Sequence, residues 1–158
     1  MRDPQLAPWL GKLLNVLRLP GDCIIFQISE TDAVAHNDQV CEFITQITSL
    51  QCKTALTNFG RALNPFQTIK KVPVSYIKID SSYITDLSKD DETKEELKTL
   101  ISSLHAHGKL TIAPMVDNAG LLPVLWQAGV NYIQGYYIQQ PRDTMDYDFS
   151  AEDEEEML

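Results

Sequence analysis

Polar and turn-forming residues follow the apolar runs of this chain at the points where binding or catalytic groups are usually found. In chain order these residues are Gln27, Glu30, Thr57, Asn58, Lys78, Asp80, Pro114, Asp117, Gln134 and Gly135. Functional groups of parallel α/β folds gather at the carboxyl ends of the strands. Because carboxylates are few, the set suits a hydrogen-bonded ligand better than a Mg²⁺ ion, which prefers several carboxylate oxygens.

Several of these residues have an ordinary structural explanation as well. Pro114 ends the run KLTIAP and can neither take nor give a proton. It could be a simple strand stop, or it could stand where a catalytic group is expected. Lys78 could bind a ligand, pair with a neighbour or face solvent. Met115 would ordinarily fill a core, and Gln134 with Gly135 could form a bulge at a strand end.

An alternation of helix and strand patterns positions these residues. Apolar spacing predicts helices around residues 6–17, 40–50, 97–104 and 118–128, and β-rich runs predict strands at 23–29, 53–60, 74–80, 109–114 and 130–138. Asp3 and Pro4 form an expected helix start. The alternation indicates βαβ units and a parallel sheet, either open and doubly wound or forming the arc of a barrel.

The net charge of −9 is concentrated at the carboxyl end of the chain. Residues 145–158 hold seven acids and no Lys or Arg, whereas the other 144 residues carry 15 acids and 13 bases. Such a block is expected to be a disordered tail, or less often a segment that docks to a partner. Binding to duplex nucleic acid is not expected, because it requires a basic face.

The sequence contains neither an apolar run of membrane-spanning length nor a known nucleotide-binding loop motif. No apolar run approaches the roughly 18–20 residues of a membrane span, and the first residues lack the apolar block of a signal peptide. A cytoplasmic location without membrane insertion is therefore expected. No GxGxxG, P-loop, zinc-ligand spacing or Ser/Cys nucleophile motif is present.

Five segments, in order, resemble the EAL domain, the cyclic di-GMP phosphodiesterase module of bacteria. They are FQISETDAV (26–34), LTNFGRALNPF (56–66), IKIDSSYI (77–84), TIAPMVDNA (111–119) and YIQGYYIQQP (132–141). The KID and QGY segments are the most specific. The resemblance covers roughly residues 3–143 and implies an α/β, TIM-barrel-like fold.

The E-A-L signature itself is absent from the chain. The resemblance therefore implies an incomplete barrel of about five βα units that lacks the first strands. Residues 1–143 would be the C-terminal part of a degenerate EAL domain, and residues 144–158 the acidic tail. The chain is expected to be a fragment of a longer protein or a truncated gene product.

At four positions a neutral residue stands where the family pattern has an acidic one. The resemblance implies that Gln27 replaces a metal-binding Glu, that Thr57 and Asn58 replace paired metal-binding Asp residues, and that Pro114 replaces a Glu near the attacking water. Hydrolysis and a metal cofactor are therefore not expected. The pattern is closest to degenerate EAL domains that regulate type IV pili and twitching motility. That implies a non-catalytic cyclic di-GMP receptor whose partner is a PilZ-domain protein.

The resemblance also implies which residues would bind the nucleotide. They are Asn58, Lys78, Pro114, Met115, Asp117, Gln134, Gly135 and Tyr136. Met115 would touch a base, Asp117 would accept from guanine or water, and Gln134 with Gly135 would line the phosphate-ribose floor. Asn58 and Lys78 would face the centre of the ring of strands, Lys78 as a countercharge to phosphate.

Two other functions stay open on the sequence. In the first, the chain is a residual phosphodiesterase whose metal is held by Asp80, Asp117 and Glu30. In the second, it is a protein-interaction module without a nucleotide, which binds through the acidic tail and an exposed sheet edge.

Overall fold

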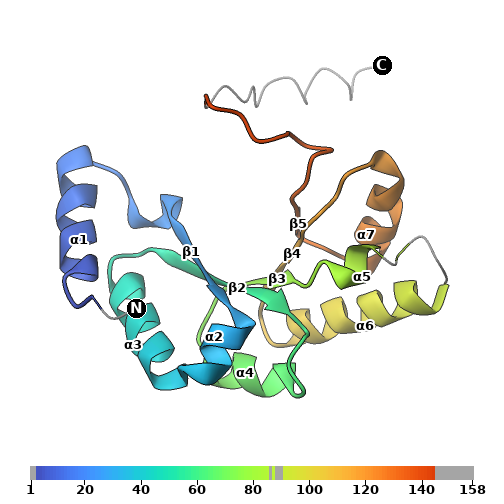
Figure 1. The fold of residues 1–158 in the computed structure, drawn as a ribbon, viewed down its shortest axis with the longest axis horizontal. Helices are drawn as coiled ribbons and strands as arrows, with labels where there is room; N and C mark the ends of the chain where they lie inside the picture. The colour runs from blue at the N-terminus through green and yellow to red at the C-terminus, as the bar shows by residue number, and fades with distance from the viewer. Residues whose placement is uncertain (1–2, 86, 88–90, 145–158) are drawn as a thin grey trace.

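Five parallel strands form one sheet, and their order in the sheet is their order in the chain (Figure 1). The strands are β1 (Ile25–Ser29), β2 (Lys53–Phe59), β3 (Tyr76–Ile79), β4 (Leu110–Ala113) and β5 (Tyr132–Ile133). The computed structural model describes residues 3–85, 87 and 91–144. The expected acidic tail, apart from Thr144, lies outside these residues.

Helical segments connect the consecutive strands, as parallel pairing requires. After α1 (Leu6–Leu17) and η1 (Gly21–Cys23) come α2 (Glu30–Ala35), α3 (Asn37–Ser49), α4 (Pro65–Lys71), α5 (Ser82–Thr85), α6 (Asp91–Ala106), η2 (Ala119–Leu121) and α7 (Leu122–Ala128). In Figure 1, α3, α4 and α6 lie along one side of the sheet. The predicted alternation of strand and helix is therefore present.

Some predicted boundaries were wrong. The fifth strand, expected over residues 130–138, has only two residues, because the chain bends at Gly135 and its carbonyl accepts the N–H of Ile138 at 3.1 Å. The first helix begins at Leu6 rather than at Asp3, whose carboxylate accepts the N–H of Gln5 at 2.9 Å.

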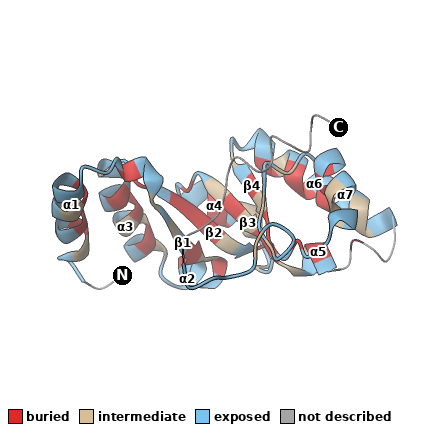
Figure 2. Cartoon of the chain, turned by 90° about the horizontal axis from the view of Figure 1, so that it is seen from above, coloured by how far each residue is buried: buried red, intermediate tan, exposed pale blue. Residues whose placement is uncertain are grey.

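The main core lies between the sheet and its helices (Figure 2). Its residues with 2 % exposure or less include Leu56, Ile77 and Ile79 on strands and Ile44, Leu97, Ile101, Leu104 and Leu125 on helices. The spacing of these helical residues, three or four apart on α6, is the stripe that the sequence shows. A smaller cluster of Leu10, Leu14, Ile47 and Cys52 attaches α1 to α3.

A polar network joins β4 and β5 near their amino ends. Asn131 Oδ1 accepts the backbone N–H of Thr111 at 2.8 Å and its hydroxyl at 3.0 Å, and it lies 3.0 Å from Nε2 of His105. The N–H of Asn131 in turn donates to the Thr111 hydroxyl at 3.3 Å. Thr111 is fully buried, so these bonds satisfy polar groups that would otherwise be costly to bury.

Among the described residues, β1 pairs only with β2, so its outer edge carries unpaired backbone groups. Ile25 on this edge is 42 % exposed, and Trp9 and Val16 are exposed on α1. No helix within the described ranges is long and apolar enough to cross a membrane.

Replacing Ile77 with Ala should destabilise the fold by about 2–5 kcal/mol, because it leaves a cavity in the central strand of a closed core. The same change at Ile25, on the edge strand, should cost about 0.5–1 kcal/mol, because that side chain is already in contact with water. Urea unfolding followed by circular dichroism measures both. Equal losses would contradict the assignment of Ile77 to the core and Ile25 to the edge.

Candidate functional site

A pocket of about 590 Å³ lies at the carboxyl ends of β3, β4 and β5. Its lining residues are Lys78, Pro114, Met115, Asp117, Ile133, Gln134, Gly135, Tyr136, Ile138, Gln139 and Pro141. Seven of the eight predicted binding residues are therefore together, although they come from three segments far apart in the chain. The eighth, Asn58, does not line this pocket.

The segment after β4 gives the pocket its rim. Pro114 and Val116 are buried, whereas Met115 and Asp117 are exposed, so the chain turns alternate side chains outward. Met115 has a φ of 57°, in the left-handed region that residues with a Cβ rarely adopt. Asp117 Oδ1 accepts the backbone N–H of Tyr136 at 3.3 Å, which joins the rim to the segment after β5.

Pro114 lines the pocket and also stands directly after the last residue of β4. It is buried, it follows directly on Ala113 at the end of β4, and it has no N–H to donate. The position of Pro114 fits the explanation as a strand stop, whereas its place at a former catalytic position stays a prediction. A group that transfers protons is absent from this position.

Lys78 brings the positive charge of the pocket. It lies on β3 between the buried residues Ile77 and Ile79, and its Nζ donates to Oε1 of Gln27 at 3.4 Å. Desolvation by burial lowers the pKa of Lys78 below its ordinary value. A half-buried ammonium with a neutral amide as partner can take an anionic ligand without first giving up a strong ion pair.

Asn58 occupies an irregular point of β2. The register between β2 and β3 shifts between Leu56 and Phe59, and Asn58 has a φ of 54°. Asn tolerates this backbone conformation better than most residues. Its side chain is exposed, so its predicted role at the nucleotide stays a prediction.

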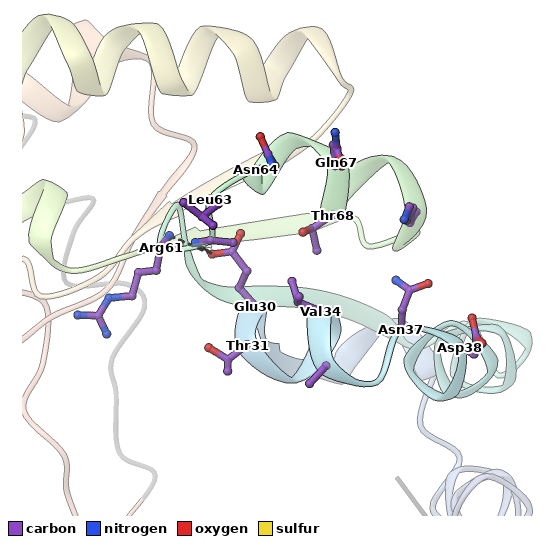
Figure 3. A pocket seen from close by; sticks show the side chains of 13 residues that line it. Glu30, Thr31, Val34, Asn37, Asp38, Arg61, Leu63, Asn64, Gln67 and Thr68 are labelled. Carbon is purple, nitrogen blue, oxygen red and sulfur yellow. Dashed lines mark hydrogen bonds between the residues drawn. The ribbon is translucent and has the colours of Figure 1, made fainter.

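Glu30 holds the loop after β2 from inside the protein. It is 2 % exposed, and its Oε2 accepts the N–H groups of Gly60 at 3.1 Å and of Arg61 and Ala62 at 3.0 Å each. Figure 3 shows its side chain pointing from α2 toward this loop. No local sequence pattern indicates this role, because the partners are backbone groups about thirty residues away.

Asp80 is also committed to internal contacts. Its Oδ1 accepts from the backbone N–H of Ser82 at 3.0 Å and from the Ser82 hydroxyl at 2.7 Å, and its Oδ2 lies 3.2 Å from Nε of Arg61. Asp80 is 3 % exposed. Glu30 and Asp80 therefore fix the loops beside the strand ends and do not face the pocket.

A larger pocket, of about 780 Å³, lies between α2 and α4 (Figure 3). Its walls include Val34, Asn37, Leu63 and Gln67, and none of the eight predicted binding residues. Size alone does not identify a ligand site. The pocket at the carboxyl ends of β3 to β5 is the candidate site, because the functional side chains converge there.

The described residues do not fit a divalent metal ion closely. They contain no group of three or more His, Cys, Asp or Glu that could hold one. The strand ends contribute the neutral Gln27, Thr57 and Asn58 and the cationic Lys78, and Asp80 is paired with Arg61.

The sequence profile of the EAL domain family matches residues 1–141 of this chain. Among characterised proteins, the cyclic di-GMP phosphodiesterase PdeB of Shewanella oneidensis is 27 % identical over 142 residues, which are 90 % of this chain and 17 % of PdeB. The chain therefore spans less than a fifth of the length of that relative.

A solved structure is more similar. The FimX EAL domain from Pseudomonas aeruginosa, bound to c-di-GMP, is 48 % identical and superposes with a TM-score of 0.88 over 94 % of this chain and 61 % of that chain. The predicted EAL fold, with about five βα units, is confirmed, whereas the predicted role in pilus regulation stays a prediction.

The expectation that no metal is involved was wrong. A structure of Klebsiella pneumoniae BlrP1, which shares the fold (18 % identity, TM-score 0.80, 89 % of this chain and 36 % of that chain), is a manganese and cyclic di-GMP complex. The physical reason is that such an ion can be held by one or two carboxylates together with substrate phosphates and water. The number of acidic residues at the strand ends therefore does not predict whether a metal ion binds.

Replacing Glu30 with Ala should destabilise the chain by about 2–4 kcal/mol, because three partly buried backbone N–H groups of the loop lose a charged acceptor. Glu42→Ala, at an exposed position of α3, is the control and should cost less than about 0.5 kcal/mol. Thermal unfolding of both variants measures the difference. If the two variants have the same melting temperature, Glu30 does not hold the loop.

Proposed function

The chain belongs to the EAL domain family, and on that premise we propose that it is a cyclic di-GMP receptor that does not hydrolyse the nucleotide. The observation that carries the proposal is the convergence of seven predicted binding residues on one pocket at the strand ends. The similarity to a FimX EAL domain solved with c-di-GMP supports the choice of ligand.

The pocket offers a complementary group for each part of a guanine nucleotide. The exposed side chains of Met115 and Tyr136 present apolar surface to a base. The carboxylate of Asp117 can accept hydrogen bonds from the N–H groups of guanine. Lys78 supplies a positive charge for phosphate, and its half-buried position strengthens that interaction relative to one in open water.

The absence of hydrolysis is inferred from what the acids do. Asp80 is buried with both carboxylate oxygens engaged by Ser82 and Arg61, and the buried Glu30 holds three loop N–H groups through Oε2, so using these oxygens in catalysis would break the contacts. Pro114, at the end of β4, has no proton to exchange. Asp117 is the one carboxylate of the three candidates that lines the pocket.

We further propose that the domain transmits nucleotide binding to a protein partner, with a PilZ domain as the predicted partner and pilus-based motility as the predicted output. This part of the proposal rests on the resemblance to FimX alone. A cytoplasmic location stays a prediction from the sequence, where no apolar run approaches the length of a membrane span.

A second candidate is a phosphodiesterase with an altered metal site. The names of relatives favour it, since PdeB is a cyclic di-GMP phosphodiesterase, and so does the manganese complex of BlrP1. Asp117 would then have to bind the metal together with the nucleotide phosphates.

Two measurements on this chain separate the candidates. Calorimetry with cyclic di-GMP, with and without Mn²⁺ or Mg²⁺, reports binding, and chromatography of the same mixtures reports cleavage. A receptor gives heat and intact nucleotide in every mixture. Linear product in the presence of a metal establishes the phosphodiesterase. If the mixtures show no heat of binding and no product, both candidate functions are rejected.

Replacing Lys78 with Met should weaken cyclic di-GMP binding about tenfold, because a charged contact to phosphate contributes on the order of 1.5 kcal/mol. It should also raise the melting temperature at neutral pH, because the fold no longer buries an ammonium. The burial penalty applies in full below the lowered pKa of Lys78 and fades as the pH rises toward 10.5, so the stability gain should shrink over that interval.

Lys53→Met is the matched control for Lys78→Met, because Lys53 is exposed at the start of β2, away from the pocket. It should change neither affinity nor melting temperature appreciably. Unchanged binding by the Lys78→Met variant would remove Lys78 from the site.

A further inference from the structure

The backbone at Gly135 lies against the backbone at Val116 so closely that no side chain fits between them. A Cβ atom at residue 135 would meet Val116 O at 2.2 Å, Val116 N at 2.3 Å and Val116 C at 2.6 Å. All three are backbone atoms, which cannot move aside as the end of a flexible side chain can. The contact therefore requires glycine for reasons of space.

Hydrogen bonds on both sides of Gly135 join residues 134–137 to residues 113–116. Val116 N–H donates to the carbonyl of Gln134 at 3.0 Å, and Tyr137 N–H donates to the carbonyl of Val116 at 3.0 Å. One step earlier, Gln134 N–H donates to the carbonyl of Ala113 at 2.8 Å. Residues 113–116 and 134–137 thus form one backbone unit, and Gly135 sets the distance within it.

Met115 stands at the point of this unit that faces the pocket. Its left-handed φ of 57° is unfavourable for a residue with a Cβ, so the surrounding bonds must impose it. Met115 and Asp117 also line a neighbouring pocket of about 550 Å³ on their other side, together with Leu121 and Val124. A small shift of the turn would therefore give the Met115 side chain another place to lie.

We propose that Gly135 is a positioning residue for the nucleotide site. It fixes Val116 and so holds Met115 and Asp117 at the positions where both line the ligand pocket. The resemblance also implies that Gly135 lines the phosphate-ribose floor, which stays a prediction. The inference rests on the proposed function for the identity of the ligand, whereas the geometry it concerns exists without ligand.

The first test replaces Gly135 with Ala and measures cyclic di-GMP affinity by calorimetry. Affinity should fall about tenfold or more, because both rim residues move. The control is Gly120→Ala, where a Cβ would meet the side-chain oxygen of Asn118 at 3.0 Å and no backbone atom. The control should bind normally. Normal binding by the Gly135→Ala variant would overturn the inference.

A mutant cycle distinguishes positioning from direct contact. If Gly135 acts through Met115 and Asp117, then adding Gly135→Ala to a variant that carries both Met115→Ala and Asp117→Ala should cost less than about threefold in affinity, because both side chains to be positioned are gone. A full tenfold loss in that background would mean that Gly135 acts on the ligand by another route, and the inference would be wrong.

A ligand-free measurement separates this inference from the proposed function. In ¹³C-methyl spectra, the Met115 signal should shift in the Gly135→Ala variant and stay in place in Gly120→Ala. If the wild-type chain does not bind cyclic di-GMP, the proposed function fails, and this signal alone decides the inference. An unshifted signal rejects it.

If the Gly135→Ala variant does not fold, two substitutions at Met115 test the same geometry. Met115→Gly should melt about 2–4 °C above Met115→Ala, because glycine adopts the imposed backbone conformation freely. Equal melting temperatures, or a higher one for Ala, would show that the turn is not imposed on residue 115.

Discussion

Parallel pairing of strands that are consecutive in the chain places all their carboxyl ends at one edge of the sheet. The rest of this structure depends on that constraint. Lys78 on β3, Met115 after β4 and Gln134 after β5 meet in one pocket because each follows a strand that points the same way. The helices between the strands are the necessary return paths, and their apolar stripes form the core under the sheet.

Much of this arrangement could be predicted from the sequence, for identifiable reasons. The spacing of Leu97, Ile101 and Leu104 marks a helix because each lies on the same face, and all three are fully buried. The fifth strand was predicted too long because aromatic and β-branched residues follow Gly135, and strand propensity does not register a bend caused by backbone contact. The role of Glu30 was beyond local patterns, since three backbone N–H groups on a distant loop define it.

Acidic residues in this domain divide into two kinds by environment and not by position along the chain. Glu30 and Asp80 are enclosed and hold loops, although Oε1 of Glu30 has no hydrogen-bond partner among the described residues, whereas Asp117 is exposed beside the pocket with a single long bond to Tyr136. The sequence alone leaves all three as candidate metal ligands of a residual phosphodiesterase. The structure separates them by how much internal bonding each would lose on binding something else.

The network of Thr111, Asn131 and His105 lies near the amino ends of β4 and β5, away from the ligand pocket. Its place has an evolutionary consequence. These three residues do not line the ligand pocket, so a substitution in the pocket that keeps the Gly135–Val116 contact can change recognition while this joint between the last two strands stays intact. A lineage can then exchange chemistry at one edge for recognition while inheriting the same scaffold.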